Sequence, residues 1–511
     1  MKENPLKIFT IFFILGILII PFDSAAADGA SRPYLDVLTT IHNLNSVLYF
    51  LDEMLLDHPE IFMVMPSVLM EGVLQGTEWI DPDRQIAIGF KYRSNPPDIF
   101  ILIPFLFEHQ AFSDIYDATI VNDSYLITLP PGQAEAINRA VESELLNASL
   151  SPPKGDFHSV FQTGRMFQAD DERSVAFHTY PLDLASIAKQ TETASLGFRI
   201  GTSDLRFSVK LLPLKNSDLF KLVSSFNKSA SWTSSADYIP AHPFLLQTTP
   251  FDLPTFFRLL RSSIVGENRL KDSEFERFSE ILHHFSGEAI VGFSIKNGRL
   301  DFEAITVLND ATPSSDFLET TVMPWFLKWE GVFKRGEDSV VAGRKVVGIH
   351  PQAPLMQPFP FHSESHPYRA LNIPEVRMTG IDRFLLVAPS DDRLNKLMGQ
   401  IGSTKTEASN RPGAFFSADT EALTIAIIPP EALQKDNPTD SNLSGIRIQS
   451  DVVNGTSIIN ADIPKEDLKY LISNMMHILS FQNKTLQEPG GRETPNKTDP
   501  NIQKPRIDKP N

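Results

Sequence analysis

The feature that most constrains the fold is a hydrophobic rhythm that recurs along the chain. In GFRIGTSDLRFSVKLL (197–212), apolar residues occupy every second position on both sides of a short polar turn. Period two places the apolar side chains of a strand on one face, and a short link containing Gly joins antiparallel neighbours. The segment therefore predicts a β-hairpin with one apolar face.

Three further segments share this pattern, and each begins with a glycine followed by an apolar residue: Gly89-Phe90, Gly292-Phe293 and Gly445-Ile446. The turns Asn297-Gly298 and Asn454-Gly455 are of the type that favours two-residue hairpins. We therefore expect paired strands at Gly89, Gly197, Gly292 and Gly445.

A helical pattern follows three of the hairpins. After the 197 hairpin, Asn216 or Ser217 is a suitable helix cap, and the apolar stripe that follows has a spacing of three or four residues. The stripes are Leu219, Leu222, Val223 and Phe226; then Leu318, Thr321, Val322 and Trp325; then Leu468, Leu471, Ile472 and Met475. We expect Pro324 to end the second helix. These helices should cover the apolar faces of the hairpins.

The order of these segments predicts an α+β fold made of two related halves, 28–231 and 232–484. Each half should contain mainly antiparallel sheet, built from hairpin-helix repeats with the helices packed on one face. The second half carries an insertion at about 325–375, which we interpret as a hairpin plus a Pro- and His-rich loop. The tail 485–511 is rich in Pro, Asn and charge, and we expect it to be disordered.

The N-terminus has the pattern of a secretory signal peptide. Lys2 and Lys7 precede the apolar run Ile8–Ile20, Pro21 ends it, and Ala25-Ala26-Ala27 is a small-residue cleavage motif. The run is shorter than the ~20 residues of a spanning helix. We expect cleavage after Ala27, secretion or transfer to a periplasm, and no transmembrane span in the mature protein.

Composition limits the classes of partner and chemistry. The 511 residues carry a formal net charge of −17, which disfavours nucleic acid as a partner. There is no cysteine, so thiol catalysis, disulfides and lipid attachment at a cleavage-site cysteine are excluded. An exported chain of this size without disulfides suits a bacterial envelope.

One segment resembles a known family. YIPAHPFLLQTTPFDLPTFFRLL, beginning at Tyr238, resembles the opening of modules in a family of uncharacterised bacterial secreted or envelope proteins. A Tyr-x-Pro-Ala-Asp phrase starts a strand in those modules, and an Asp-Leu pair starts a helix. The matching residues here are Tyr238, Pro240, Ala241, Asp252, Leu253 and Gly287, whereas His242 stands in place of the Asp. The resemblance implies extracytoplasmic modules and no particular activity.

No enzyme motif stands out. The chain has no nucleophile elbow, no phosphate-binding loop and no His-Glu-x-x-His motif, and we expect no cofactor. The candidate metal site is His362, Glu364 and His366, whose alternate side chains would converge in an extended loop. A surface loop without metal is the simpler interpretation, and a hydrolase whose site does not show in the sequence remains an alternative.

Phenylalanine is abundant, with 37 residues against four tryptophans. Two modules of sheet and helix can enclose an apolar groove, and its candidate lining residues are Phe90, Phe198, Phe207, Phe293 and Phe302. The simpler interpretation is that these rings fill the cores between sheet and helices. The function that we expect is non-enzymatic binding or scaffolding outside the cytoplasm, with an envelope protein as the partner. The alternative is a periplasmic carrier of an apolar ligand such as a lipid.

Overall fold

The structure is a computed structural model. It describes residues 34–56, 65–91, 98–129, 139–166, 178–179, 182–183, 187–226, 242–263, 276, 279–296, 299–309, 314–328, 332–352, 355–358, 368–403, 414–420, 422–423 and 443–474. The predicted signal peptide and the predicted tail both lie outside these residues.

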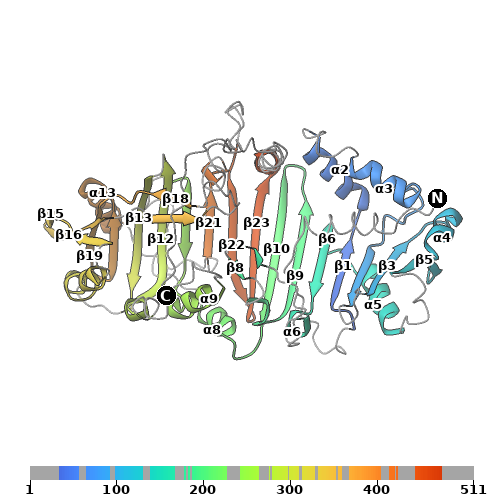
Figure 1. Cartoon of the computed structure of the whole chain (residues 1–511), viewed down its shortest axis with the longest axis horizontal. Coiled ribbons are helices and arrows are strands. Elements are labelled where there is room, and N and C mark those ends of the chain that lie inside the picture. The colour runs from blue at the N-terminus through green and yellow to red at the C-terminus, as the bar shows by residue number, and fades with distance from the viewer. Residues whose placement is uncertain are drawn as a thin grey trace, which may run out of the picture.

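Nineteen of the described strands form one sheet that runs the length of the molecule, and all pairings between its strands are antiparallel (Figure 1). The other four form two small hairpins, β7 (His178–Thr179) with β8 (Leu182–Asp183) and β17 (Leu355–Pro358) with β18 (Tyr368–Leu371). From one edge to the middle, the order is β4 (Thr119–Ile120), β5 (Ser124–Leu129), β3 (Asp98–Pro104), β2 (Ile86–Lys91), β1 (Val37–Ile41), β6 (Phe157–Phe161), β9 (Thr191–Ile200) and β10 (Asp204–Pro213). The order continues with β23 (Thr456–Pro464), β22 (Ile446–Val453), β21 (Ala414–Ala418), β11 (Phe244–Thr248), β12 (Phe285–Lys296), β13 (Arg299–Leu308), β20 (Phe384–Ala388) and β19 (Val376–Ile381). An α+β fold with a mainly antiparallel sheet is therefore confirmed.

The four predicted hairpins are present. They are β2–β3, β9–β10, β12–β13 and β22–β23, and each pairs consecutive strands. Asn454 and Gly455 have φ of 52° and 78°, the left-handed conformations that a two-residue hairpin turn of type I′ requires. Asn297-Gly298 lies outside the described residues, but Lys296 and Arg299 on either side of it are paired.

The strand order is the same on both sides of the β10–β23 pair. Outward from β10 come β9, β6, β1, β2, β3, β5 and β4, and outward from β23 come β22, β21, β11, β12, β13, β20 and β19. Strands at the same distance from the middle also appear in the same order along the chain. The two segments meet edge to edge, so one sheet continues from the first into the second.

The helices lie on both faces of this sheet. Face A is the side to which Ile88 and Phe198 point, and face B is the side of their neighbours Gly89 and Gly197. Face A is packed by α2 (Leu44–Leu55), α3 (Pro66–Leu74), α4 (Gln110–Tyr116), α8 (Asp218–Ser225), α9 (Leu253–Ser263), the segment 314–327 and helix 465–474. Face B is packed by α5 (Arg139–Leu150) and α13 (Asp391–Ser403).

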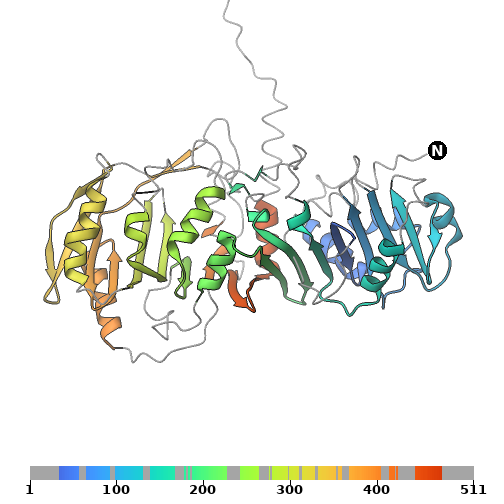
Figure 2. The same cartoon turned by 90° about the horizontal axis from the view of Figure 1, so that it is seen from below.

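The expectation of helices on one face is therefore wrong for both ends of the sheet. Strands there are apolar on both sides: in β3, Ile101 belongs to the core on face A and Phe100 to the core on face B. A strand that is apolar on both faces needs cover on both. Figure 2 shows the yellow helical segment 314–327 and the orange α13 on opposite sides of their strands.

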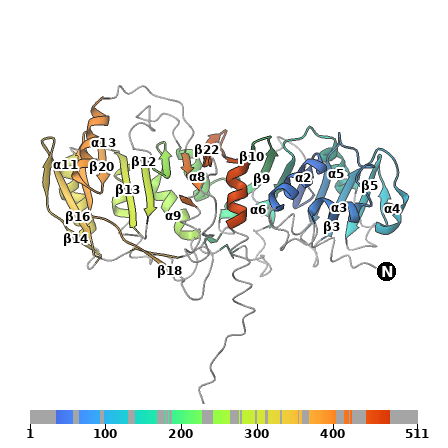
Figure 3. The ribbon, with the colours of Figure 1, turned by 90° about the horizontal axis from the view of Figure 1, so that it is seen from above.

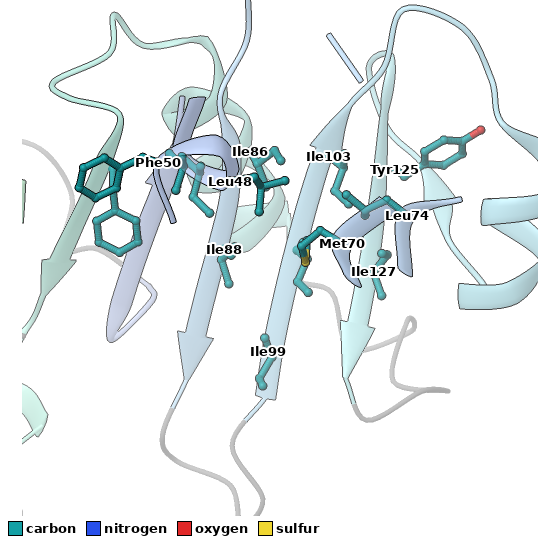
Figure 4. Packing of buried hydrophobic residues seen from close by; sticks show 14 of the residues in the cluster. Leu48, Phe50, Met70, Leu74, Ile86, Ile88, Ile99, Ile103, Tyr125 and Ile127 are labelled. Carbon is teal, nitrogen blue, oxygen red and sulfur yellow. The ribbon is translucent and has the colours of Figure 1, made fainter. Parts of the chain in front are cut away.

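The largest core lies on face A of the first half. Leu48 of α2 and Met70 of α3 pack on alternate residues of β2 and β3, among them Ile88 and Ile103 (Figure 4). Leu468 and Ile472 of helix 465–474 pack against the same core, and this helix lies near the middle of the molecule (Figure 3). The last helix of the second half thus contributes to the core of the first half.

The helices after the hairpins differ in one respect from the prediction. Ser217 caps α8 as expected, because its hydroxyl accepts a hydrogen bond of 3.0 Å from the backbone N–H of Phe220. Pro324, however, does not end its helix, which continues through α12 (Met323–Leu327). A π-helical segment, η3 (Leu318–Val322), precedes it. Proline has no N–H to donate, and the changed hydrogen-bond spacing of a π turn accommodates that loss.

The insertion contains the expected hairpin. β15 (Ser339–Val341) and β16 (Arg344–Pro351) pair across Ala342-Gly343, and β16 also pairs with β14 (Phe333–Arg335) and β19. The hairpin thus extends the large sheet at its second edge.

Candidate functional site

The five candidate phenylalanines all point to face A, and four of them, Phe90, Phe198, Phe207 and Phe302, lie in or against the hydrophobic cores. Phe198 is buried and stacks on Phe157, with ring centroids 5.0 Å apart. Phe90 and Phe207 pack against the same core, and Phe302 packs against the core beneath the segment 314–327. Phe293 stacks on Phe244 at 4.7 Å.

These rings form two separate groups. Phe207 lies directly opposite Phe198, and Phe302 lies directly opposite Phe293. Four strands, β23, β22, β21 and β11, separate the first pair from the second. Core filling accounts for the contacts that these five side chains make.

The predicted metal ligands His362, Glu364 and His366 lie outside the described residues. Among the residues that the structure does describe, no group of three or more His, Asp or Glu side chains could hold a metal ion. His350, the neighbouring candidate, lies on β16 with an exposed side chain.

A buried charged cluster lies on face B where α13 begins. Arg393, in the first turn of α13, donates from Nη1 to both carboxylate oxygens of Asp301, at 2.8 and 2.7 Å, and from Nε to Glu303. His242 Nε2 lies 3.3 Å from Glu303 Oε2 and 3.2 Å from Arg393 Nη2. The side chain of Glu303 is only 1% exposed and that of His242 only 5%.

The contacts of Glu303 keep it ionised despite its burial. Burial alone would raise the pKa of the carboxyl, but the hydrogen bonds from His242 and Arg393 outweigh it and hold the pKa below the usual 4.5. Both carboxylate oxygens have a partner, so the group has little freedom to act as a base. The cluster joins the start of α13 to β13.

The corresponding place in the first half is apolar. In the first half, three residues lie side by side on adjacent strands, in the order Leu38, Gly89 and Phe100. In the second half, the residues in the same order are Leu245, Gly292 and Glu303. By this register Glu303 occupies the position of Phe100. His242, three residues before Leu245, occupies that of Leu35, which packs with Phe100 in the core beneath α5.

One feature of the sequence indicates this cluster, namely two acidic residues at alternate positions of a predicted strand. In LDFEA, Asp301 and Glu303 alternate with Phe302, so two acids share one face of a strand that is otherwise apolar. His242, the residue that departs from the Tyr-x-Pro-Ala-Asp phrase, supplies the contact to Glu303. An acid there would place a third carboxylate at the cluster.

The second candidate site is an exposed polar surface in the middle of face B. We call it the central strip, and its members are Arg199, Arg206, Asn460, Asp462, Arg447 and Gln449, from four adjacent strands. All six side chains are exposed. Among the described residues, the cores beneath α5 and α13 contain no side chain of β9, β10, β23 or β22, because these two helices cover strands farther out on either side.

The arginines of the central strip are incompletely paired. Arg206 contacts Asp204 at 2.7 Å and Asp462 at 3.8 Å. Arg199 lies directly opposite Arg206, and neither Arg199 nor Arg447 forms an ion pair with another described residue. Like charges directly opposite each other destabilise a sheet, so packing and stability do not account for this arrangement.

A largely buried histidine, His158, lies next to the strip. His158 on β6 lies opposite Gly197 on face B. Burial, together with the positive charges of Lys154 and Lys210, lowers the pKa of its imidazole from 6.5 to about 4. Burial is the larger cause, so the lowered pKa describes the surroundings of His158 itself and not the net charge of the strip.

Comparison with known proteins gives no assignment: no family model, no curated protein and no solved structure matches the chain. Among the described residues, no helix is both long and apolar enough to cross a membrane.

Proposed function

We propose that this chain is an exported, non-enzymatic binding or scaffold protein, built from two duplicated halves, and that the central strip is its binding surface. The observation that carries the proposal is an exposed polar strip between two helix-covered regions, in which Arg199 and Arg447 form no ion pair with another described residue. Guanidinium groups without a counter-ion are suited to binding carboxylates or phosphates through paired hydrogen bonds.

Three features support the rest of the proposal. The identical strand order on both sides of the β10–β23 pair supports a duplication. The leader with its small-residue cleavage motif supports export, and the absence of cysteine is compatible with it. The lack of recognised catalytic motifs, together with the full hydrogen bonding of Glu303, favours binding over catalysis.

The carrier alternative is less well supported. A lipid carrier needs an apolar cavity, whereas the five candidate phenylalanines lie in two separated groups, and four of them pack in or against cores that helices cover. Lipid extraction of the purified protein tests this alternative, because a carrier isolated from its source should release bound lipid.

Site-specific photo-cross-linking in the cells that make the protein tests the main proposal. A photoreactive residue at Asn460, inside the strip, should give a discrete adduct that excess unlabelled protein abolishes. The same residue at Val340, which is 73% exposed on β15, should give none. Equal labelling at both positions, or no adduct at Asn460, would contradict the proposal.

A further inference from the structure

We propose that the central strip binds an extended acidic segment of a partner protein, laid across the strands. This inference rests on the proposed function, because it names the partner chemistry of the same surface.

The charges favour an anionic partner. Face B of the four central strands carries Arg199, Arg206, Lys210 and Arg447 against Asp204, Asp451 and Asp462, in a chain whose net charge is −17. At physiological ionic strength, charges act over about 8 Å, so a bound segment responds to these residues more than to distant acids. Arg199 and Arg447, which have no ion-pair partner in the described part of the chain, can each bind a carboxylate without breaking an ion pair seen there.

The spacing favours an extended chain. Arg199, Arg206, Asp462 and Arg447 form one row across neighbouring strands, so Arg199 and Arg447 are three strand spacings apart, roughly 14 Å. An extended peptide rises about 3.3 Å per residue, so acids four residues apart are about 13 Å apart on the same side. A stretch of five or more residues can therefore reach both unpaired arginines.

The helices on face B disfavour a membrane surface. Six strands, β6, β9, β10, β23, β22 and β21, separate the strands that α5 covers from those that α13 covers. At about 4.8 Å per strand, the sheet surface between α5 and α13 is roughly 30 Å wide, and each of the two helices is about 10 Å across. A planar lipid surface would contact α5 and α13, which protrude from face B, before it reached the strands between them. A polypeptide is narrow enough to lie between the two helices.

Binding of labelled peptides to the full chain tests the inference. We expect a fluorescent octaglutamate peptide to bind, measured by anisotropy at 0.15 M salt, and an octaglutamine peptide not to bind. The variant R199Q/R206Q/R447Q should bind octaglutamate at least tenfold more weakly. The matched control K189Q/K215Q/K334Q removes the same charge at exposed lysines outside the strip and should bind as the wild type does.

Each other outcome contradicts the inference in an identifiable way. Equal losses in both triple variants would indicate general charge attraction. Binding of phosphatidylglycerol vesicles or heparin without binding of octaglutamate would assign the strip to a lipid or a polysaccharide. If octaglutamate fails to bind while Asn460 still cross-links to a partner, the binding surface stands and the acidic segment is wrong; failure of both would overturn the proposed function as well.

Discussion

Ser208 of β10 lies directly opposite Asn460 of β23, and the register of the sheet is symmetric about this pair. Counting inward from Gly89, one residue per strand, leads through Leu38, Val160 and Ser195 to Lys210, which lies opposite Ile458. Counting from Gly292 leads through Leu245, Ser417 and Arg447 to Asp462, which lies opposite Arg206. Both endpoints are two residues from the Ser208–Asn460 pair, so Gly89 and Gly292 occupy equivalent places.

The charged cluster should be sensitive to the loss of one member and tolerant of replacement as a unit. Glu303→Ala leaves Arg393 and the buried His242 without their shared partner, so we expect a loss of roughly 3 kcal/mol in the free energy of unfolding. The triple variant H242L/E303F/R393L should restore most of that loss, because it places the residues of the first half at positions 242 and 303 and also removes the arginine that would be left without Glu303. Urea denaturation measures both, and a triple variant as unstable as Glu303→Ala would contradict the view that the two places are equivalent.

His158 should make the protein less stable in acid. Its pKa is about 4 in the folded state and 6.5 in the unfolded chain, so between these values the unfolded state binds more protons. The free energy of unfolding should therefore fall as the pH drops from about 6.5 to about 4, by at most about 3 kcal/mol from this group. In His158→Gln this contribution should disappear, so a pH profile identical to that of the wild type would be evidence against it.

Two glycines should respond to alanine in opposite directions. Gly287 has φ of +80°, and an added Cβ would lie 2.5 Å from the backbone oxygen of Phe251, so Gly287→Ala should destabilise the protein by about 1–3 kcal/mol. Gly399 lies within α13 with open space around it, so Gly399→Ala should stabilise it by about 0.5–1 kcal/mol. Thermal unfolding measures both effects; the same sign for both would be inconsistent with this backbone geometry.

Removal of Arg199 separates binding from stability. Arg199→Thr removes a like charge opposite Arg206 and introduces a residue that suits strands, so the thermal midpoint should stay the same or rise. Octaglutamate binding should weaken in the same variant. A variant that unfolds at lower temperature would indicate that Arg199 has a structural role.

The sequence predicted the hairpins and the cap of α8 because these features depend on neighbours in the chain. Alternation around Gly197, the Asn454-Gly455 turn and the Ser217 hydroxyl each act within a few residues. The motif pairs Gly197 with Gly445, but the sheet register places Gln449 at the position equivalent to Gly197. A repeated motif fixes a local shape, whereas the register is set by pairing across the sheet.

The candidate sites depended on contacts that no local pattern contains. Arg393 meets Glu303 from 90 residues away and His242 from 151 residues away. The central strip combines strands β9 and β10 with β22 and β23, from opposite halves of the chain, and only the β10–β23 pairing makes it one surface. The phenylalanines were conspicuous by number, but abundance does not distinguish a core from a groove.

The most direct test of this account is a pair of cysteines at Ser208 and Asn460, which is free of interference because the chain has no cysteine. Opposite residues of paired strands have Cβ atoms about 5 Å apart, close enough for mild oxidation to join them. We predict a disulfide within one chain for S208C/N460C, detected by mass spectrometry of a proteolytic digest, and none for the control S208C/Q449C, whose residues are two strands apart. Folded S208C/N460C protein that forms no such disulfide, or forms it no faster than the control, would contradict the joining of the two halves and the central strip that depends on it.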